Sequence, residues 1–231
     1  MEKTILNIGG RTCVLYEQEQ PEFLLVQPVD EHDLKTLDDE TEAIEALSNR
    51  SAVLVALTIN DWQHELSPWA TPPVFGKKSF GDGAQSTLSL ITNVLLPALS
   101  ATRGYDMQRI QLLLGGYSLA GLFALWAGYN SSCFEGIAAA SPSVWFPQWN
   151  AYISTRMMHA EAVYLSLGDK EEMTRNEMMA QVGTAIRIQY DRLQECNIAC
   201  TFEWNKGNHF QDTARRTARA FSWLMGNIFH Q

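Results

Sequence analysis

A serine between small residues marks the first segment that could do chemistry. Ser118 lies in the segment Gly-Tyr-Ser-Leu-Ala-Gly, residues 116–121, between an apolar run and a longer apolar stretch. A serine on a sharp strand-to-helix turn needs small neighbours, because its backbone is strained and a nearby Cβ would collide with the adjacent strand or helix. Gly116 and Gly121 meet this need, and Ala120 stands where the G-x-S-x-G pattern has glycine. We therefore predict that Ser118 is an activated nucleophile on a slightly crowded turn.

The stretch after this serine is predicted to be a helix that favours negative charge at the turn. Residues 119–129 carry apolar side chains at helical spacing. The N-terminus of such a helix offers free N–H groups and the positive end of the helix dipole. Acyl transfer develops a negative charge on the carbonyl oxygen of its substrate. Because the residue after the nucleophile donates in such sites, Leu119 N–H is the expected first oxyanion donor.

His209 is the histidine whose place in the chain fits a general base. Where serine, acid and histidine follow one another in that order, the histidine lies between a late strand and the last helix. Among the five histidines, only His209 meets this condition. Gly207 and Asn208 form a turn that would bring its imidazole toward Ser118. His64 lies in a long loop, where it would contact a substrate or simply be solvated.

The third member of such a site is a carboxylate, and three candidates follow the predicted strand at 162–167. In serine hydrolases with this residue order, the acid often lies three residues beyond the glycine that ends the strand, which favours Glu171. Asp169 is the main alternative, although it could instead start the turn by bonding to its own backbone. Glu172 is a further candidate. The acid would hold the His209 tautomer and stabilise the imidazolium.

The elements that must position these residues alternate along the chain. Short apolar runs predict strands at 12–16, 23–27, 52–59, 110–114, 136–140, 162–167 and 199–204. Helical spacing predicts helices at 34–47, 85–99, 119–129, 177–195 and 213–229. The runs at 53–57 and 111–114 are apolar on both faces, which a strand tolerates when helices cover both sides of a mostly parallel sheet. The expected fold class is α/β, with a doubly wound sheet.

Length and composition predict one domain. The chain has 231 residues, of which 46% are apolar and 19% are charged, close to the average of globular proteins. A single domain spanning residues 1–231 is therefore expected. The longest irregular stretch covers residues 60–84. Loops of that length in a compact domain are usually functional, so this one is expected to lie near the mouth of the active site.

Charge and cysteine usage exclude several classes of partner. A formal net charge of -9 repels phosphate backbones and anionic lipid surfaces, which argues against nucleic acid and membranes as partners. The four cysteines form no C-x-x-C pair and have no histidine at zinc-ligand spacing, so neither a metal site nor disulfides are expected. No apolar run approaches the ~18 residues of a membrane helix, and the N-terminus has no export signal. We expect a cytoplasmic protein.

Taken together, these segments resemble the esterase family of α/β hydrolases that contains esterase D and the enterochelin esterases. The similarity runs from about Phe80 to the C-terminus and more faintly from Phe23. It rests on Phe-Gly-Asp-Gly-Ala at 80–84, Leu-Leu-Pro at 95–97, residues 116–121, Ala-Ser-Pro-Ser-Val-Trp at 140–145, Gly-Asp-Lys-Glu at 168–171 and Gly-Asn-His at 207–209. Within the second of these segments, Pro97 is expected to end a helix slightly before Leu99.

The resemblance implies an α/β-hydrolase fold and assigns the site. It implies that Ser118, His209 and a carboxylate near Glu171 form a catalytic triad. It also implies that Trp145 lines the acyl or leaving-group pocket, for which ordinary packing is the alternative. The chemistry needs no metal and no organic cofactor.

The resemblance further places a second oxyanion donor in the turn that follows the strand at 23–27. Family members usually have a glycine in that turn, whereas this chain has Gln-Pro-Val-Asp at 27–30. Pro28 has no N–H, so the donor would be Val29 or Asp30. An acidic side chain there would oppose a developing negative charge unless it points away.

These residues predict acyl transfer from a small-molecule carboxylic ester through an acyl-enzyme on Ser118. A thioester or a siderophore-type ester is the alternative substrate, because the same triad would cleave either. The rival hypothesis, from a different functional class, is a hydrolase fold without catalytic activity that binds a ligand or partner. Ala120 and the turn at Pro28 motivate it.

Overall fold

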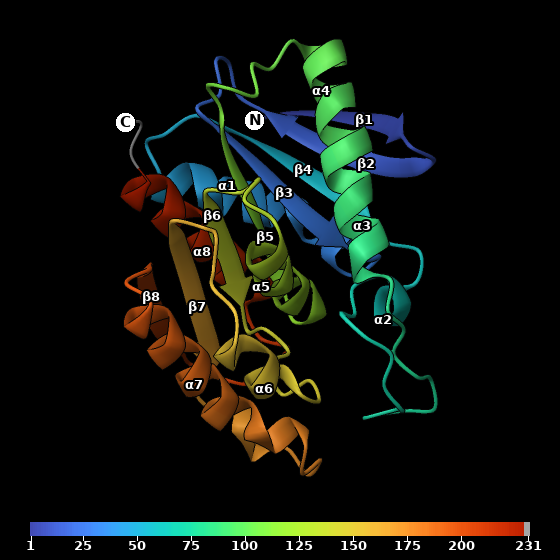
Figure 1. Cartoon of the computed structure of the whole chain (residues 1–231). Helices are drawn as coiled ribbons and strands as arrows, with labels where there is room; N and C mark the ends of the chain where they lie inside the picture. Colours follow the sequence, from blue (N-terminus) through green and yellow to red (C-terminus); the bar gives the residue numbers. More distant parts are fainter. Residues whose placement is uncertain (229–231) are drawn as a thin grey trace.

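Eight strands form one sheet in the computed structural model, which describes residues 1–228 (Figure 1). Their order across the sheet is β1-β2-β4-β3-β5-β6-β7-β8. The strands are β1 Glu2–Ile8, β2 Arg11–Glu17, β3 Phe23–Val29, β4 Ala52–Thr58, β5 Gln111–Tyr117, β6 Gly136–Ala140, β7 Ala162–Gly168 and β8 Ala199–Asn205. The strands from β4 to β8 in this order pair in parallel, and β1 and β2 are antiparallel additions at one edge.

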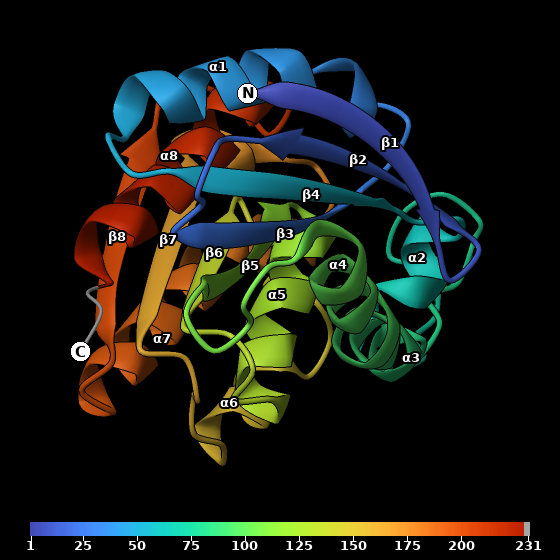
Figure 2. The same cartoon turned by 90° about the horizontal axis from the view of Figure 1, so that it is seen from above.

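Helices cover both faces of this sheet, which is why its central strands are apolar on both sides (Figure 2). The helices are α1 Leu37–Leu47, α2 Trp62–Glu65, α3 Ala84–Leu90, α4 Leu96–Arg103, α5 Leu119–Asn130, α6 Trp149–Ser154, α7 Val182–Glu195 and α8 Thr213–Asn227. Side chains of α1 and α8 pack in the core on one face, and those of α3 to α7 pack in the core on the other. Every residue of β3 and of β7 is buried. The predicted α/β class with a mostly parallel sheet is confirmed.

The strand predicted at 23–27 is two residues too short, and the predicted turn at 27–30 is wrong. β3 continues to Val29, because Pro28 and Val29 pair with Leu57 and Thr58 of β4. Successive N–H groups of a strand point to opposite edges, and Val29 faces β4, where its C=O accepts the N–H of Ile59 at 3.0 Å. The missing N–H of Pro28 therefore falls on the β5 side, where the pairing has already ended at Val26.

The helix predicted at 85–99 extends further than expected. α3 runs into a π-helical turn at Ile91–Leu95 and then into α4, which ends at Arg103 with a left-handed Gly104. The expectation that Pro97 ends the helix is wrong. A π turn carries hydrogen bonds from residue i to i+5, and it places Pro97 in the first turn of the following α-helical segment. A proline is tolerated at that position because the first N–H groups of an α-helix have no helical acceptor.

The long segment at 60–84 carries structure of its own. It begins with the short helix α2 and returns through a bridge between Thr71 and Phe80. The indole of Trp69 donates to the C=O of Pro147 at 3.0 Å, and Asn176 Nδ2 donates to the C=O of Val74 at 2.6 Å. These bonds tie the segment to the loops that follow β6 and β7.

None of the helices within residues 1–228 has the length and apolar character needed to cross a membrane. The most deeply buried helix, α5, has 12 residues, and it lies against the sheet.

Candidate active site

Ser118 lies on a strained turn between β5 and α5. Its backbone has φ 57° and ψ -117°, a conformation that costs a non-glycine residue about 1–3 kcal/mol and needs support from its surroundings. The support comes from β6 and its following loop. Ser118 N–H donates to the C=O of Ala140 at 3.1 Å, and Ser118 C=O accepts the N–H groups of Leu122 and Ser143 at 3.1 and 3.0 Å. The strained turn aims the hydroxyl away from the sheet and into a cavity.

Close approach explains the glycines around this serine. A Cβ on Gly116 would lie 2.6 Å from the Cβ of Ala120, and a Cβ on Gly121 would lie 3.0 Å from the C=O of Gly116. The methyl group of Ala120 therefore fits only because Gly116 has no side chain. The pattern Gly-x-Ser-x-Ala is crowded but intact.

The N-terminus of α5 begins at this turn. The first N–H groups of an α-helix have no acceptor within the helix, so the N–H of Leu119 is free of helical bonding. Leu119 lines the same cavity as Ser118. The helix dipole adds positive potential at this point. The geometry is compatible with the predicted donor role of Leu119, which stays a prediction.

His209 comes from the loop between β8 and α8. Its Nε2 lies 3.0 Å from Ser118 Oγ, so this pair forms a hydrogen bond whose direction depends on the tautomer. Gly207 makes the turn possible, since its φ of +106° is strained for any residue with a side chain. The loop is anchored by Tyr117, whose hydroxyl donates to the C=O of His209 at 2.8 Å. Burial, followed by the charge of Glu171, raises the pKa of Tyr117 to about 12, so this phenol stays a donor.

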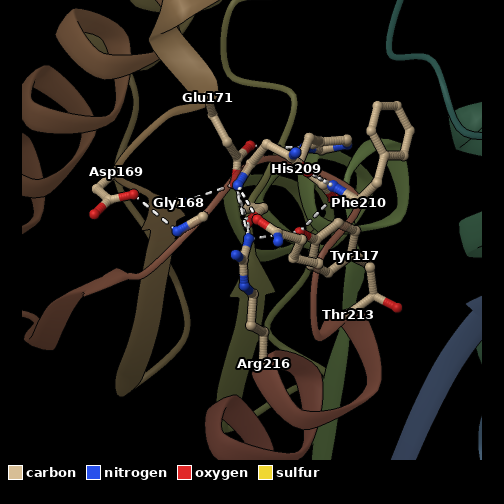
Figure 3. A network of polar contacts seen from close by, with 12 residues as sticks. Tyr117, Gly168, Asp169, Glu171, His209, Phe210, Thr213 and Arg216 are labelled. Atoms are coloured by element: carbon tan, nitrogen blue, oxygen red, sulfur yellow. Dashed lines mark hydrogen bonds and ion pairs between the residues drawn. The ribbon is translucent and has the colours of Figure 1, made fainter.

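Glu171 completes a chain of hydrogen bonds. Its Oε2 lies 2.6 Å from His209 Nδ1. Its Oε1 accepts from Gly168 N–H and from Ser141 Oγ, both at 2.7 Å, and from Arg216 Nη1 at 3.1 Å (Figure 3). Only 4% of the Glu171 side chain is exposed. Both carboxylate oxygens of Glu171 thus take part in hydrogen bonds, so the carboxylate can fix the orientation of the imidazole.

The two other predicted carboxylates lie elsewhere. Asp169 Oδ1 accepts the N–H of Gly207 at 2.8 Å, so it joins the loop after β7 to the loop after β8. Glu172 lies 3.7 Å from Arg187 in an exposed ion pair. Of the three candidates, Glu171 is the one whose side chain contacts His209.

A cavity of about 500 Å³ opens above this chain of hydrogen bonds. Its walls are mostly aromatic and aliphatic, and Trp145 is among them, 9% exposed and in edge contact with Phe75 and Phe80. The lining residues are Trp62, Phe75, Phe80, Ser118, Leu119, Ser141, Pro142, Ser143, Trp145, Lys170, Glu171, Met173, Thr174, Met179, Val182, Asn208, His209 and Phe210. The segment at 60–84 supplies Trp62, Phe75 and Phe80 to this wall.

Three large apolar side chains at the cavity are exposed to solvent. Phe210, Met173 and Phe75 are 86%, 74% and 46% exposed, and each comes from a different loop. Apolar side chains that are exposed around a cavity mark a binding surface for an apolar group. We call these three residues the apolar rim.

Val29 and Asp30, the predicted second oxyanion donors, do not line the cavity. The side chain of Val29 is packed in the core beneath α1 and α8, and its C=O is bonded to Ile59 of the β4 end. Asp30 N–H points to Asp33 Oδ2 at 3.3 Å. The structure thus brings Ser118, Leu119, His209, Glu171 and Trp145 together and leaves Val29 outside.

Sequence reasoning did not identify Ser143 and Arg216. Ser143 Oγ lies 3.3 Å from Ser118 Oγ and belongs to the Ser-Pro-Ser segment that follows β6. Arg216 is fully buried under the carboxylate. In the sequence, Arg216 could have been noticed because it lies four positions before Ala220 and eight before Leu224. This spacing places a charged residue on the apolar side of α8.

No cluster of three or more histidine, cysteine or carboxylate side chains with metal-binding geometry occurs in the described part of the chain.

In sequence, no protein-family model and no curated protein matches this chain. In structure, it is similar to the siderophore hydrolase EstA from Aspergillus nidulans, with a TM-score of 0.76, 18% identity, and 98% of this chain and 95% of EstA covered. An IroE-like serine hydrolase from Shewanella oneidensis gives a TM-score of 0.78 and 14% identity, covering 100% of this chain and 82% of the hydrolase.

The enterobactin esterase FES from Shigella flexneri is similar as well, with a TM-score of 0.68 and 16% identity. The match covers 99% of this chain but only 60% of the esterase. At these identities the likeness concerns the fold, and this chain has the fold of the α/β hydrolases.

Proposed function

We propose that this chain, an α/β hydrolase by fold, hydrolyses carboxylic esters of small molecules through an acyl-enzyme on Ser118. The observation that carries the proposal is the continuous chain of hydrogen bonds from Glu171 through His209 to Ser118, with heavy-atom distances of 2.6 and 3.0 Å. It stands at the N-terminus of a buried helix and opens into an apolar cavity. Nucleophile, base and orienting acid in this relation are the parts that acyl transfer needs.

In the first half of the reaction, Ser118 Oγ attacks the ester carbonyl carbon and its proton moves to His209 Nε2. The negative charge on the carbonyl oxygen is stabilised by Leu119 N–H at the start of α5. Glu171 keeps the other ring proton on Nδ1 and stabilises the imidazolium. The bond to the leaving oxygen then breaks, and His209 delivers its proton to the leaving alcohol.

In the second half, water replaces the alcohol. Its proton moves to His209 as its oxygen attacks the acyl carbon, and the bond to Ser118 Oγ breaks as the serine regains a proton. The products are an acid and an alcohol. The aromatic wall and the apolar rim support an ester with a sizeable apolar group, because both would be desolvated by such a group.

The test compares Ser118→Ala with a matched serine variant. We expect the wild-type protein to hydrolyse a short-chain activated ester and to be labelled by a fluorophosphonate probe on Ser118. Ser118→Ala should lose both, while Ser86→Ala, at an exposed position on α3, keeps both. Circular dichroism checks that both variants fold. Turnover that survives in folded Ser118→Ala contradicts the mechanism.

A siderophore-type ester is the second candidate substrate, favoured by the names of two structural neighbours, a siderophore hydrolase and an enterobactin esterase. A panel of simple alkyl esters, aryl esters, thioesters and a catechol-bearing lactone, compared by kcat/KM, distinguishes the classes.

The rival proposal, a silent fold that binds a ligand, is motivated by the position of Val29 outside the cavity. Absence of probe labelling in the folded wild-type protein would favour it, because labelling requires the nucleophile, the base and the oxyanion site together.

A further inference from the structure

Arg216 is a buried cation directly beneath the proposed site. It is the fourth residue of α8, and its relative exposure is 0%. Burying a guanidinium is costly unless charge and hydrogen bonds compensate it. Arg219, three residues further along the same helix, is 39% exposed and pairs with Glu203. The two arginines therefore differ in surroundings on one helix.

The guanidinium binds several parts of the site at once. Nη1 donates to Glu171 Oε1 at 3.1 Å and to the hydroxyl of Tyr117 at 2.9 Å, with Ser141 Oγ at 3.4 Å (Figure 3). Nη2 donates to the C=O of Lys206 at 3.1 Å, in the loop that leads to His209. One side chain from α8 thus holds the acid after β7, the end of the nucleophile strand and the loop of the base.

The charge of Arg216 has one buried counterion, Glu171. The groups that face this pair are the neutral phenol of Tyr117 from β5 and the imidazole of His209. On the acid loop, Asp169 accepts the N–H of Gly207, and Lys170 lines the same cavity as Glu171 and His209. On α1, which packs against α8, the buried carboxyl is Glu40, and it bonds to Gln27 rather than to this site.

Arg216, Gly168 N–H and Ser141 Oγ all donate to Glu171 Oε1, so this oxygen is held from three sides. The other oxygen, Oε2, is thereby left to bond to His209 Nδ1. The contact with Arg216 therefore fixes Glu171 for its hydrogen bond to the imidazole.

We infer that Arg216 is a positioning residue for the proposed reaction: it holds Glu171 against His209 and fixes the loop that carries His209. The inference rests on the proposed function for its kinetic readout. It also has a readout that is independent of turnover, because the proton between His209 Nδ1 and Glu171 can be followed by NMR.

The experiment compares Arg216→Met with Arg219→Met. In folded Arg216→Met, we expect kcat to fall at least tenfold with KM unchanged, because the base loses its orientation while the lining of the cavity is kept. The NMR signal of the His209 Nδ1 proton, assigned with His209→Gln, should be weakened or lost. Arg219→Met should leave both unchanged, because its partner Glu203 lies outside the cavity.

A purely structural role predicts a lower free energy of unfolding with kcat and the Nδ1 proton signal unchanged, and that result in folded Arg216→Met overturns the inference. If the wild type cleaves no ester, the proposed function fails, while the Nδ1 proton signal still decides the role of Arg216.

Arg216→Lys covers the case in which Arg216→Met does not fold. One ammonium keeps the charge but cannot reach both Glu171 and the C=O of Lys206 with the fork geometry of a guanidinium. We expect at least tenfold lower kcat with KM unchanged. Wild-type kcat in this variant overturns the positioning role.

Discussion

The carboxyl group of Glu40, buried between the sheet and α1, should make the stability of the protein depend on pH. The side chain is 3% exposed, and its one hydrogen bond within the described residues is from Gln27 Nε2 at 3.3 Å. Burial raises the pKa of Glu40 from 4.5 to about 8, so the carboxyl is neutral in the native protein at pH 7. In the unfolded chain it is ionised at that pH.

The sign of the pH dependence follows from proton binding. Between pH 4.5 and about 8 the native protein holds a proton on Glu40 that the unfolded chain has lost, so the free energy of unfolding falls as the pH rises through this window. The slope for one proton is about 1.4 kcal/mol per pH unit, which amounts to about 3 kcal/mol between pH 5.5 and 7.5. Asp33, whose pKa burial raises to about 6, adds a contribution of the same sign.

Glu40→Gln removes this contribution, because the amide is neutral in both states and has nearly the same shape. We expect Glu40→Gln to be more stable than the wild type by about 1.4 kcal/mol at pH 5.5 and by about 4 kcal/mol at pH 7.5, with the effect of Asp33 common to both proteins. Urea denaturation followed by tryptophan fluorescence at the two pH values measures this difference. Glu42→Gln, exposed on the same helix, is the control and should show no such change. A Glu40→Gln difference that is flat with pH, or a destabilised variant, refutes the reasoning.

Three further variants test the geometry of the site. Gly116→Ala places a Cβ 2.6 Å from that of Ala120, so it should lower the free energy of unfolding by about 1–3 kcal/mol and reduce probe labelling of Ser118. A second change, Ala120→Gly, should partly restore both, as measured by denaturation and labelling assays. Tyr117→Phe removes the phenol that joins Arg216 to the His209 carbonyl, and should cost about 1–2 kcal/mol in urea denaturation and lower kcat. Phe210→Ala, at the apolar rim, should raise KM for esters with a large apolar group and leave kcat and short-chain substrates unchanged; a lower kcat for both would contradict the rim role.

The sequence predicts those parts of the fold whose apolar residues recur with a clear spacing or form short runs. Strands β6 (Gly136–Ala140) and β7 can be predicted because their apolar runs end at turns. The edge strand β1 is harder to identify, since its mixed pattern is half exposed, although Gly9 and Gly10 with positive φ supply a two-residue hairpin signal. α6 is short and follows a bend, so periodicity does not reveal it.

The residues of the site likewise include some that the sequence predicts and others that only the structure reveals. Ser118 and His209 can be found from their order and from their turns, and Glu171 from its distance to the end of β7, as their contacts illustrate. β3 continues past Pro28 because it pairs with β4. This pairing cannot be predicted from the residues next to the proline. Arg216 is recognisable only from the tertiary packing that buries it, because the same residue on an exposed face would be an ordinary solvated cation.

Asp169 links the two loops that carry the proposed acid and base, because its side chain accepts the N–H of Gly207. Together with the hydrogen bond between Glu171 and His209, it fastens the loops after β7 and β8 into one unit. Trp62, Phe75 and Phe80 of the cavity wall come from the segment at 60–84, on the far side of the nucleophile strand. In the proposed reaction, substrate selectivity and proton transfer therefore depend on separate segments of the chain. Residues of the 60–84 segment can change while the distances within the joined loops stay the same.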